Sequence, residues 1–273
     1  MVTDSAAAPA GGRRLALGIA YRGVAYHGWQ SQPDGCTVQD RVEAALSAFA
    51  DHAVSTTCAG RTDTGVHALN QVVHVDAPVE RASMSWLRGT NRYLPDDIAL
   101  QWCRPVADDF HARFSALGRR YRYKLLESPV RPSLETGLVG WVFRPLDGDA
   151  MRQAAEWLIG EHDFTSFRSA ACQARSPVKQ LHRIDIARQG AYWHFDFDGS
   201  AFLHHMVRNI MGCLLAVGQG ARPVTWMAEV LAARNRDVAA PTFDAAGLYF
   251  AGPYYDARHA IPQHTAAFDW LAA

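Results

Sequence analysis

The order of strand-like and helix-like segments repeats once along the chain, and this repeat most limits what the chain can fold into. In the first half, the pattern of apolar residues predicts strands at 15–21, 54–58, 68–77 and 98–102, and helices at 38–49 and 85–93. In the second half it predicts strands at 120–126, 181–187, 193–197 and 247–252, and helices at 149–159, 203–217 and 226–233. Strand, helix, strand, strand, helix, strand is the split-βαβ pattern.

This repeat predicts an α+β fold built from two split-βαβ, ferredoxin/RRM-like halves. We expect the halves to form a continuous, mostly antiparallel sheet with helices packed on it and a central cleft. The predicted organisation is a flexible tail at 1–12, an N-terminal α/β half at 13–105, a C-terminal α/β half at 106–256 and a C-terminal tail at 257–273.

Composition is that of an ordinary globular protein. The 273 residues are 49% apolar and 20% charged, and a chain of this length can bury about 70% of its unfolded surface. Five widely spaced cysteines without a C-x-x-C pair indicate neither a disulfide framework nor a cysteine-based zinc site, so we expect a reducing cytoplasm. Because the longest apolar stretch, 202–217, is short and carries charge, no membrane span is predicted.

Charge is balanced overall but not along the sequence. A net charge of zero argues against nucleic-acid binding by bulk electrostatics. Segment 104–124 nevertheless holds six basic residues against two acids, whereas 237–273 holds four acids and one base. A local basic stripe at 104–124 is therefore predicted, within which Tyr121 and Tyr123 alternate with cations as at a base-stacking surface. An amphipathic strand packed against a helix is the alternative.

The loop GRTDTGVH at 60–67 is the segment most suited to chemistry. Glycines near both ends let a loop between two strands present Arg61 and Asp63 outward. Asp63 could then be a nucleophile or a general base, and Arg61 could hold a phosphate or displace a base. A structural Asx-turn, in which Asp63 caps its own backbone, is the alternative.

Arg208 lies in a predicted helix that is otherwise apolar. A buried arginine needs an acidic partner, because an unpaired buried charge costs about 3 to 5 kcal/mol. Asp63 is the candidate partner, and snorkelling of Arg208 to solvent is the alternative. The twelve histidines, including the adjacent His204 and His205, show no H-E-x-x-H or other ligand spacing. They are interpreted as structural or solvated, and no metal site is predicted.

Five motifs together resemble the tRNA pseudouridine synthase A family. They are YRGVAYHGWQSQ at 21–32, GRTDTGVH at 60–67, RRYRY at 119–123, FLHHMVRNI at 202–210 and GLYF at 247–250. The motifs occur in the family's order and extend over about residues 15–255. The resemblance implies an isomerase that converts uridine to pseudouridine at positions 38, 39 and 40 in the anticodon stem-loop of tRNA. It also implies a cytoplasmic homodimer that uses neither cofactor nor metal.

The same resemblance assigns roles to individual residues. Asp63 becomes the aspartate that attacks the uridine or its ribose, and Arg208 its ion-pair partner. Tyr121 becomes the ring that stacks on the uracil and an acceptor for the last proton. Arg61 is expected to hold the flipped nucleotide, and Leu248 to lie near the pocket wall. Arg119 and Arg122, which belong to the basic stripe at 104–124, are also expected to bind the substrate. Thr64 and Phe250 depart from the family's usual alanine and aliphatic residue, and neither replaces a reacting group.

Two other functions compete with an RNA-modifying isomerase. One is a tandem RNA-binding protein that reads tRNA shape without catalysis. The other is a carboxylate glycoside hydrolase, which would need a second, comparably placed carboxylate. The set of Arg61, Asp63, Tyr121 and Arg208 favours the isomerase over the binder, and no second glycine-flanked acidic loop supports the hydrolase.

Overall fold

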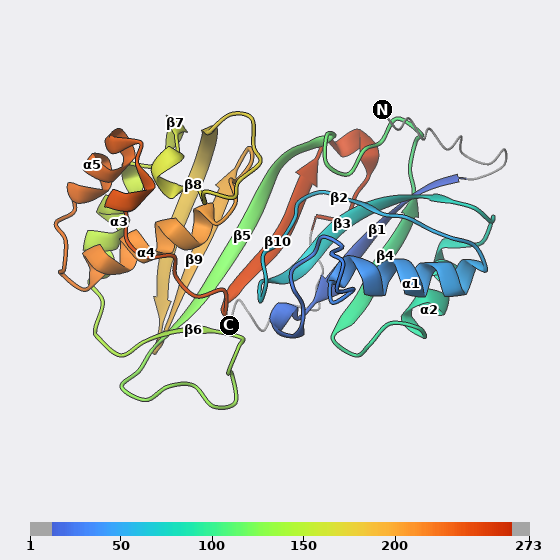
Figure 1. Cartoon of the computed structure of the whole chain (residues 1–273), viewed down its shortest axis with the longest axis horizontal. Helices are drawn as coiled ribbons and strands as arrows, with labels where there is room; N and C mark the ends of the chain where they lie inside the picture. The colour runs from blue at the N-terminus through green and yellow to red at the C-terminus, as the bar shows by residue number, and fades with distance from the viewer. Residues whose placement is uncertain (1–12, 264–273) are drawn as a thin grey trace.

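The computed structural model describes residues 13–263, which form one ten-stranded sheet with helices packed on it (Figure 1). The hydrogen-bonded order is β4-β1-β3-β10-β5-β9-β8-β7, and the short strands β2 and β6 pair with β3 and β5. All pairs are antiparallel except β3–β10 and β5–β6. The strands are β1 (Arg13–Tyr21), β2 (Thr57–Cys58), β3 (His67–Ala77), β4 (Ile98–Pro105), β5 (Ala116–Glu127), β6 (Gly140–Val142), β7 (Gly160–Asp163), β8 (Val178–Gln189), β9 (Tyr192–Gly199) and β10 (Leu248–Tyr255).

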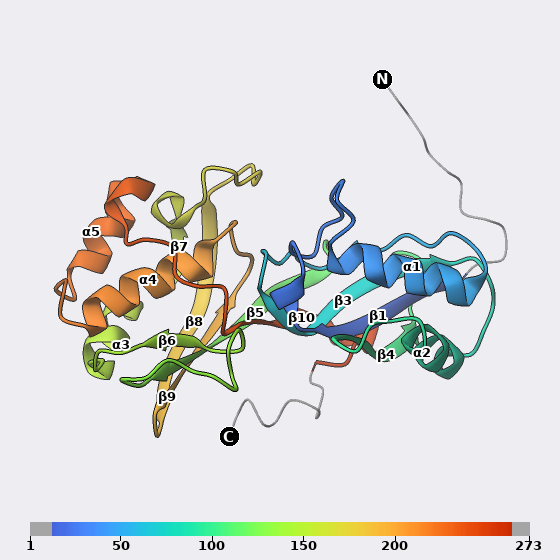
Figure 2. The ribbon, with the colours of Figure 1, turned by 60° about the horizontal axis from the view of Figure 1, so that its bottom comes forward.

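The helices gather at the two ends of this sheet. Figure 2 shows α1 and α2 beside β1, β3 and β4, and α3, α4 and α5 beside β7, β8 and β9, with β10 and β5 between the two groups. The α-helices of the described residues are α1 (Val38–Ala50), α2 (Ser83–Asn91), α3 (Gly148–Glu156), α4 (Met206–Gly218) and α5 (Trp226–Ala233). The predicted continuous, mostly antiparallel α+β sheet is confirmed.

The first half closes around the apolar face of α1. The Thr37 side chain accepts a hydrogen bond from the Asp40 amide, which is the predicted N-cap. Val42 and Leu46 then lie at helical spacing in a buried cluster with Trp86 of α2. This cluster fixes α1 and α2 against β1, β3 and β4.

The second half is built on β9 and α4. Trp193, Phe195 and Phe197 alternate along β9 and are all buried, as the predicted strand requires. Helix α4 begins at Met206 instead of 203, because His205 has a left-handed backbone (φ 64°) that cannot continue a helix.

Short elements account for most other differences from the sequence prediction. Strands β6 and β7 have three and four residues, too few to show a period, and were not predicted. The predicted strand 54–58 is reduced to the two residues of β2. Helix α3 ends at Glu156 instead of 159, and Gly160 (φ 109°) opens β7 shortly after it.

The predicted tails fall largely outside the described residues. Segment 1–12 lies outside them, and so does 264–273 of the tail predicted at 257–273. The described part, 257–263, instead begins with a 3₁₀ turn (Ala257–His259) and places Ile261 in a buried cluster with Phe110 and Tyr255. In the part of the chain that the structure describes, every helix is too short or too polar to cross a membrane.

The two halves are joined by the parallel pairing of β3 with β10. His67 and Ala68 of β3 stand opposite Tyr249 and Phe250, and the His67 and Tyr249 rings stack with centroids 4.6 Å apart. Burial lowers the pKa of His67 to about 4, so the ring is neutral at physiological pH. Its Nδ1 accepts a hydrogen bond from the Gly23 amide. Its Nε2 is then free to donate across the junction to the Gly137 carbonyl, 2.8 Å away. An uncharged, fully bonded histidine thus sits at the joint.

Gly247, immediately before β10, provides a test of the close approach of β10 to β5. It has φ +87°, and an added β-carbon would lie 2.3 Å from the Lys124 carbonyl oxygen. Gly247→Ala should lower the free energy of unfolding by about 3 kcal/mol, from left-handed strain plus overpacking. Gly190→Ala is the matched control, since Gly190 has φ +59° but open space around its α-carbon. That change should cost only about 1 kcal/mol. Equal losses in urea denaturation would mean that the close approach of β10 to β5 is unimportant.

Candidate active site

The loop between β2 and β3 that carries Asp63 is held rigidly by the chain that follows β1. The Trp29 amide donates to the Thr62 carbonyl (3.1 Å), and the Thr62 and Tyr21 hydroxyls lie 2.7 Å apart in a buried hydrogen bond. Inside the loop, the Val66 amide donates to the Asp63 carbonyl (3.1 Å). Because the backbone on both sides of Asp63 is bonded, the loop presents its side chain in a defined direction.

The carboxylate of Asp63 points at helix α4. Arg208 Nη1 lies 3.3 Å from Asp63 Oδ2, while Arg208 Nε donates to the Phe243 carbonyl (2.9 Å). The two side chains are 17% and 19% exposed, so water screens the pair only partly. Among residues 13–263, no backbone amide donates to the carboxylate, so the structure does not contain the Asx-turn alternative. Arg208 does not snorkel into solvent either.

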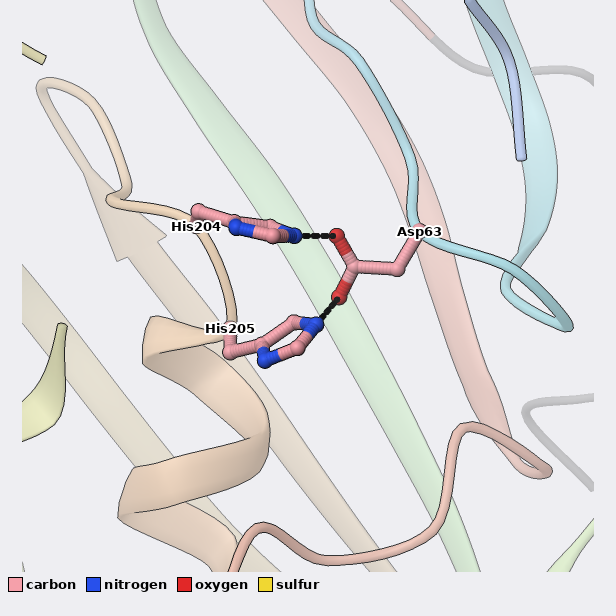
Figure 3. Close-up of side chains that lie close together, drawn as sticks. All are labelled: Asp63, His204 and His205. Carbon is pink, nitrogen blue, oxygen red and sulfur yellow. Dashed lines mark ion pairs between the residues drawn. The ribbon is translucent and has the colours of Figure 1, made fainter. Parts of the chain in front are cut away.

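Two histidines complete the surroundings of Asp63 (Figure 3). His204 Nε2 lies 3.4 Å from Oδ1, and His205 Nε2 lies 3.5 Å from Oδ2. The rings stand side by side with centroids 4.0 Å apart. Partial burial lowers the pKa of His205, and the neighbouring Asp63 opposes that shift. Sequence reasoning missed these histidines as site residues, although they lie in the same motif as Arg208, whose pairing with Asp63 brings them to the site.

Aromatic rings pack together near Asp63. The Tyr121 ring lies 5.0 Å from both the Phe202 and Phe250 rings, measured between centroids. Burial first, and then the charge of Asp63, raise the pKa of Tyr121 well above its usual value. Tyr121 is therefore a neutral phenol at physiological pH. The structure brings Asp63, Arg208 and Tyr121 together.

Arg61 and Leu248 occupy opposite environments. Arg61 is exposed, and within residues 13–263 its guanidinium has no hydrogen-bond or ion-pair partner. It is free to meet an anionic ligand. Leu248 is buried at 3% exposure in one cluster with Val66 and Ala245. Leu248 therefore belongs to the apolar core beside the Asp63 loop.

Arg122 is not brought to the site. It forms a two-pronged ion pair with Asp196, its cross-strand partner on β9 (2.7 and 2.9 Å). Arg120 pairs with its own cross-strand partner, Asp198, through a single contact of 3.2 Å. Because side chains alternate along a strand, both arginines lie on the face of β5 opposite Tyr121. Part of the predicted basic stripe is therefore neutralised by β9.

Arg119 braces the site through backbone carbonyls. Its guanidinium donates to the carbonyls of Ala59 (3.1 Å), Ser200 (3.2 Å) and Arg113 (2.6 Å). Burial lowers its pKa. Ala59 begins the Asp63 loop and Ser200 begins the segment that leads to His204. Arg119 thus ties together the two segments that meet at Asp63.

Comparison with known proteins agrees with this geometry. A family model described as tRNA pseudouridine synthase matches residues 19–115 and 154–256, which hold Asp63, Tyr121's neighbours on β10 and the whole of α4. A protein of Methylibium petroleiphilum named tRNA pseudouridine synthase A is 71% identical over 258 residues, covering 94% of this chain and 99% of that protein. The chain belongs to the tRNA pseudouridine synthase A family.

Further relatives agree with this assignment. The tRNA pseudouridine synthase A of Paracidovorax citrulli is 63% identical over 276 residues and that of Polaromonas naphthalenivorans 64% over 262, each covering 94% of this chain and 99% of the relative. A chain from a solved Cbf5-Nop10-Gar1 complex aligns with 74% of this chain and 45% of its own length, at 13% identity and a TM-score of 0.34, a likeness too weak to support an inference. Family membership thus rests on sequence relatives of nearly equal length.

A double-mutant cycle tests the ion pair of Asp63 with Arg208. Arg208→Met strands the carboxylate and should lower the free energy of unfolding by about 1 to 3 kcal/mol, less than for a fully buried pair because water and the histidines compensate in part. Arg208→Met combined with Asp63→Leu should recover about 1 kcal/mol of that loss. Urea denaturation of the four proteins measures the coupling. If the two losses in unfolding free energy simply add, Asp63 is not the partner of Arg208.

Proposed function

We propose that the protein isomerises uridine to pseudouridine at positions 38, 39 and 40 in the anticodon stem-loop of tRNA. Membership of the tRNA pseudouridine synthase A family supports the reaction class. The observation that carries the proposal is the carboxylate of Asp63, which a hydrogen-bonded loop holds against Arg208 and close enough to Tyr121 for its charge to raise the Tyr121 pKa. A binding protein without chemistry would have no need to keep a partly buried carboxylate paired in this way.

The reaction moves one bond and one proton. Asp63 attacks the uridine or its ribose, and the N1–C1′ bond breaks. The freed uracil rotates and C5 bonds to C1′. The bond that Asp63 formed breaks, which regenerates the carboxylate, the proton on C5 leaves, and N1 carries a proton in the product. Arg208 places a positive charge 3.3 Å from the Asp63 carboxylate and so holds the attacking group in position.

Tyr121 is assigned to stacking on the flipped uracil. A base inside a helix cannot be reached, so the nucleotide must be extruded at a cost of a few kcal/mol and held by stacking. The raised pKa of Tyr121 means that no phenolate is present at neutral pH. The phenol can accept the C5 proton only if its own proton moves on, so direct removal by Tyr121 is less well supported than stacking.

The remaining predicted substrate residues divide by their surroundings. Arg61, exposed and unpaired within 13–263, fits the role of holding the flipped nucleotide. Arg119 acts as a positioning residue, since its donors are used by carbonyls of the two site segments. Leu248 supports the loop through the core. The ion pair of Arg122 with Asp196 does not support a direct phosphate contact.

We also infer that the chain comprises two split-βαβ halves, 13–105 and 106–256, with a central cleft over β10 and β5. The strand orders β4-β1-β3-β2 and β10-β5-β9-β8 support the repeat. In each order the last strand of the split unit lies beside its first, and its third strand separates the first from the second. A cytoplasmic homodimer is proposed from the family. The exposed apolar side chains of Val130, Leu134 and Phe143 support association.

Asp63→Asn should abolish pseudouridine formation while tRNA affinity stays within about threefold of wild type, because the side chain supplies chemistry and little phosphate contact. Release of tritium from tRNA carrying [5-³H]uridine measures turnover, since C5 must lose its hydrogen. Asp149→Asn is the matched control, with a carboxylate 83% exposed on α3, and should retain full activity. Substantial turnover by Asp63→Asn would refute the nucleophile assignment.

Turnover should also survive EDTA once tRNA folding is maintained by polyamines, because the proposed steps use only side chains of the protein. The check is tritium release by protein dialysed against chelator. Activity that disappears on dialysis and returns with a single transition metal would contradict a cofactor-free reaction.

A further inference from the structure

The Asp63, His204 and His205 cluster brings two imidazole nitrogens and one carboxylate within reach of a single ion. The nitrogen–oxygen separations of 3.4 and 3.5 Å exceed the 2.7–3.2 Å typical of a hydrogen bond. Two ligands bonded at about 2.0 to 2.1 Å to one tetrahedral cation lie about 3.3 Å apart. All three ligand atoms lie within 4.8 Å of one another. Each histidine thus faces its own carboxylate oxygen at nearly the separation of two ligands on one cation, and the three groups can converge on a single ion.

We propose that Asp63, His204 and His205 bind a zinc-like dication that reversibly inhibits the enzyme by occupying its nucleophilic carboxylate. The binding part stands on the geometry of the three side chains, and the inhibitory part rests on the proposed function of Asp63. Inhibition follows because a carboxylate oxygen bonded to a dication is a poor nucleophile and because the ion fills the space beside the target base.

The two histidines are held ready for such an ion. The Ser169 amide donates to the His204 carbonyl (3.0 Å), and the Asn209 amide donates to the His205 carbonyl (2.9 Å). His205 also adopts a left-handed backbone, which a non-glycine residue takes only under local constraint and which turns its ring toward Asp63. Binding of an ion would therefore require little further ordering of the two histidines.

The site is open enough to admit an ion and a water. The His204 and His205 side chains are 38% and 28% exposed. Three protein ligands with a free fourth position are the arrangement of catalytic zinc sites, which exchange their fourth ligand. Two imidazoles and one carboxylate favour Zn²⁺, Co²⁺ or Ni²⁺ over Mg²⁺ and Ca²⁺, which prefer oxygen ligands. The Mg²⁺ that folds tRNA would therefore leave the enzyme active.

Arg208 limits the affinity. Its guanidinium contacts Oδ2 and repels a second positive charge on the same carboxylate, whereas Oδ1, which faces His204, has no contact with Arg208. We therefore expect a dissociation constant in the micromolar range, far weaker than a structural zinc site. An ion held this loosely can act as a reversible inhibitor and would be lost to a chelator.

Binding is tested without tRNA. Metal-free full-length protein is titrated with Zn²⁺ by calorimetry and with Co²⁺ by visible absorption, at constant pH. We expect one site per chain, and at least a tenfold loss of affinity in His204→Asn, His205→Asn and Asp63→Asn. His182→Asn, which changes an exposed histidine on β8, is the matched control and should bind as wild type. Thermal denaturation confirms that each variant is folded. Equal affinity in all four variants, or no micromolar site in wild type, would overturn the proposal.

Inhibition is tested separately by tritium release at fixed Mg²⁺. Zn²⁺ near its dissociation constant should reduce wild-type turnover at least twofold, and EDTA should restore it. Zn²⁺ that binds the cluster but leaves turnover unchanged would overturn the inhibitory role. Failure of the proposed function looks different, since metal-free wild-type protein would then release no tritium while the calorimetric site persisted.

Discussion

The parallel pairing of β3 with β10 is the contact on which the site depends. It is one of two parallel pairs in a sheet that is otherwise antiparallel, and it brings the loop before β3 close to the strand that follows the α4 and α5 helices in sequence. Two residue pairs carry this pairing, with the neutral His67 ring stacked beside them. Without this joint, the Asp63 loop and helix α4 would belong to separate layers, and no aspartate–arginine pair could form between them.

Given that joint, the pairing of Asp63 with Arg208 becomes the natural outcome of burial. Helix α4 is buried on nearly every side, so its single arginine must find a carboxylate or lose several kcal/mol. The loop supplies that carboxylate on a backbone fixed from the side of β1. The same pairing holds the carboxylate of Asp63 at the site, so one contact serves both the stability of the second half and the chemistry proposed for the site.

The sequence predicts the elements that have a period or a capping signal, and it fails where a contact depends on register. The capping residue Thr37 predicts the start of α1, and the alternation of Trp193, Phe195 and Phe197 predicts β9. Strands β6 and β7 are too short to carry a period. That Arg122 stands opposite Asp196 follows from the pairing of β5 with β9, which residue types along one strand do not reveal. The histidines beside Asp63 were missed for a related reason, since metal-ligand motifs describe local spacing and this cluster joins two distant segments.

Strand β5 explains how a protein with no net charge can meet RNA. On one face, Arg120 and Arg122 are neutralised by aspartates of β9, so their positive charge contributes little outside the protein. On the other face lie Tyr121, whose ring we propose stacks on a base, and Arg119, whose guanidinium donates to backbone carbonyls. Within the described residues this leaves Arg61 as the unpaired arginine of the loop, beside the one carboxylate that must react. We therefore expect recognition near the site to depend on the placement of Arg61 in the Asp63 loop rather than on the number of basic residues in the strand.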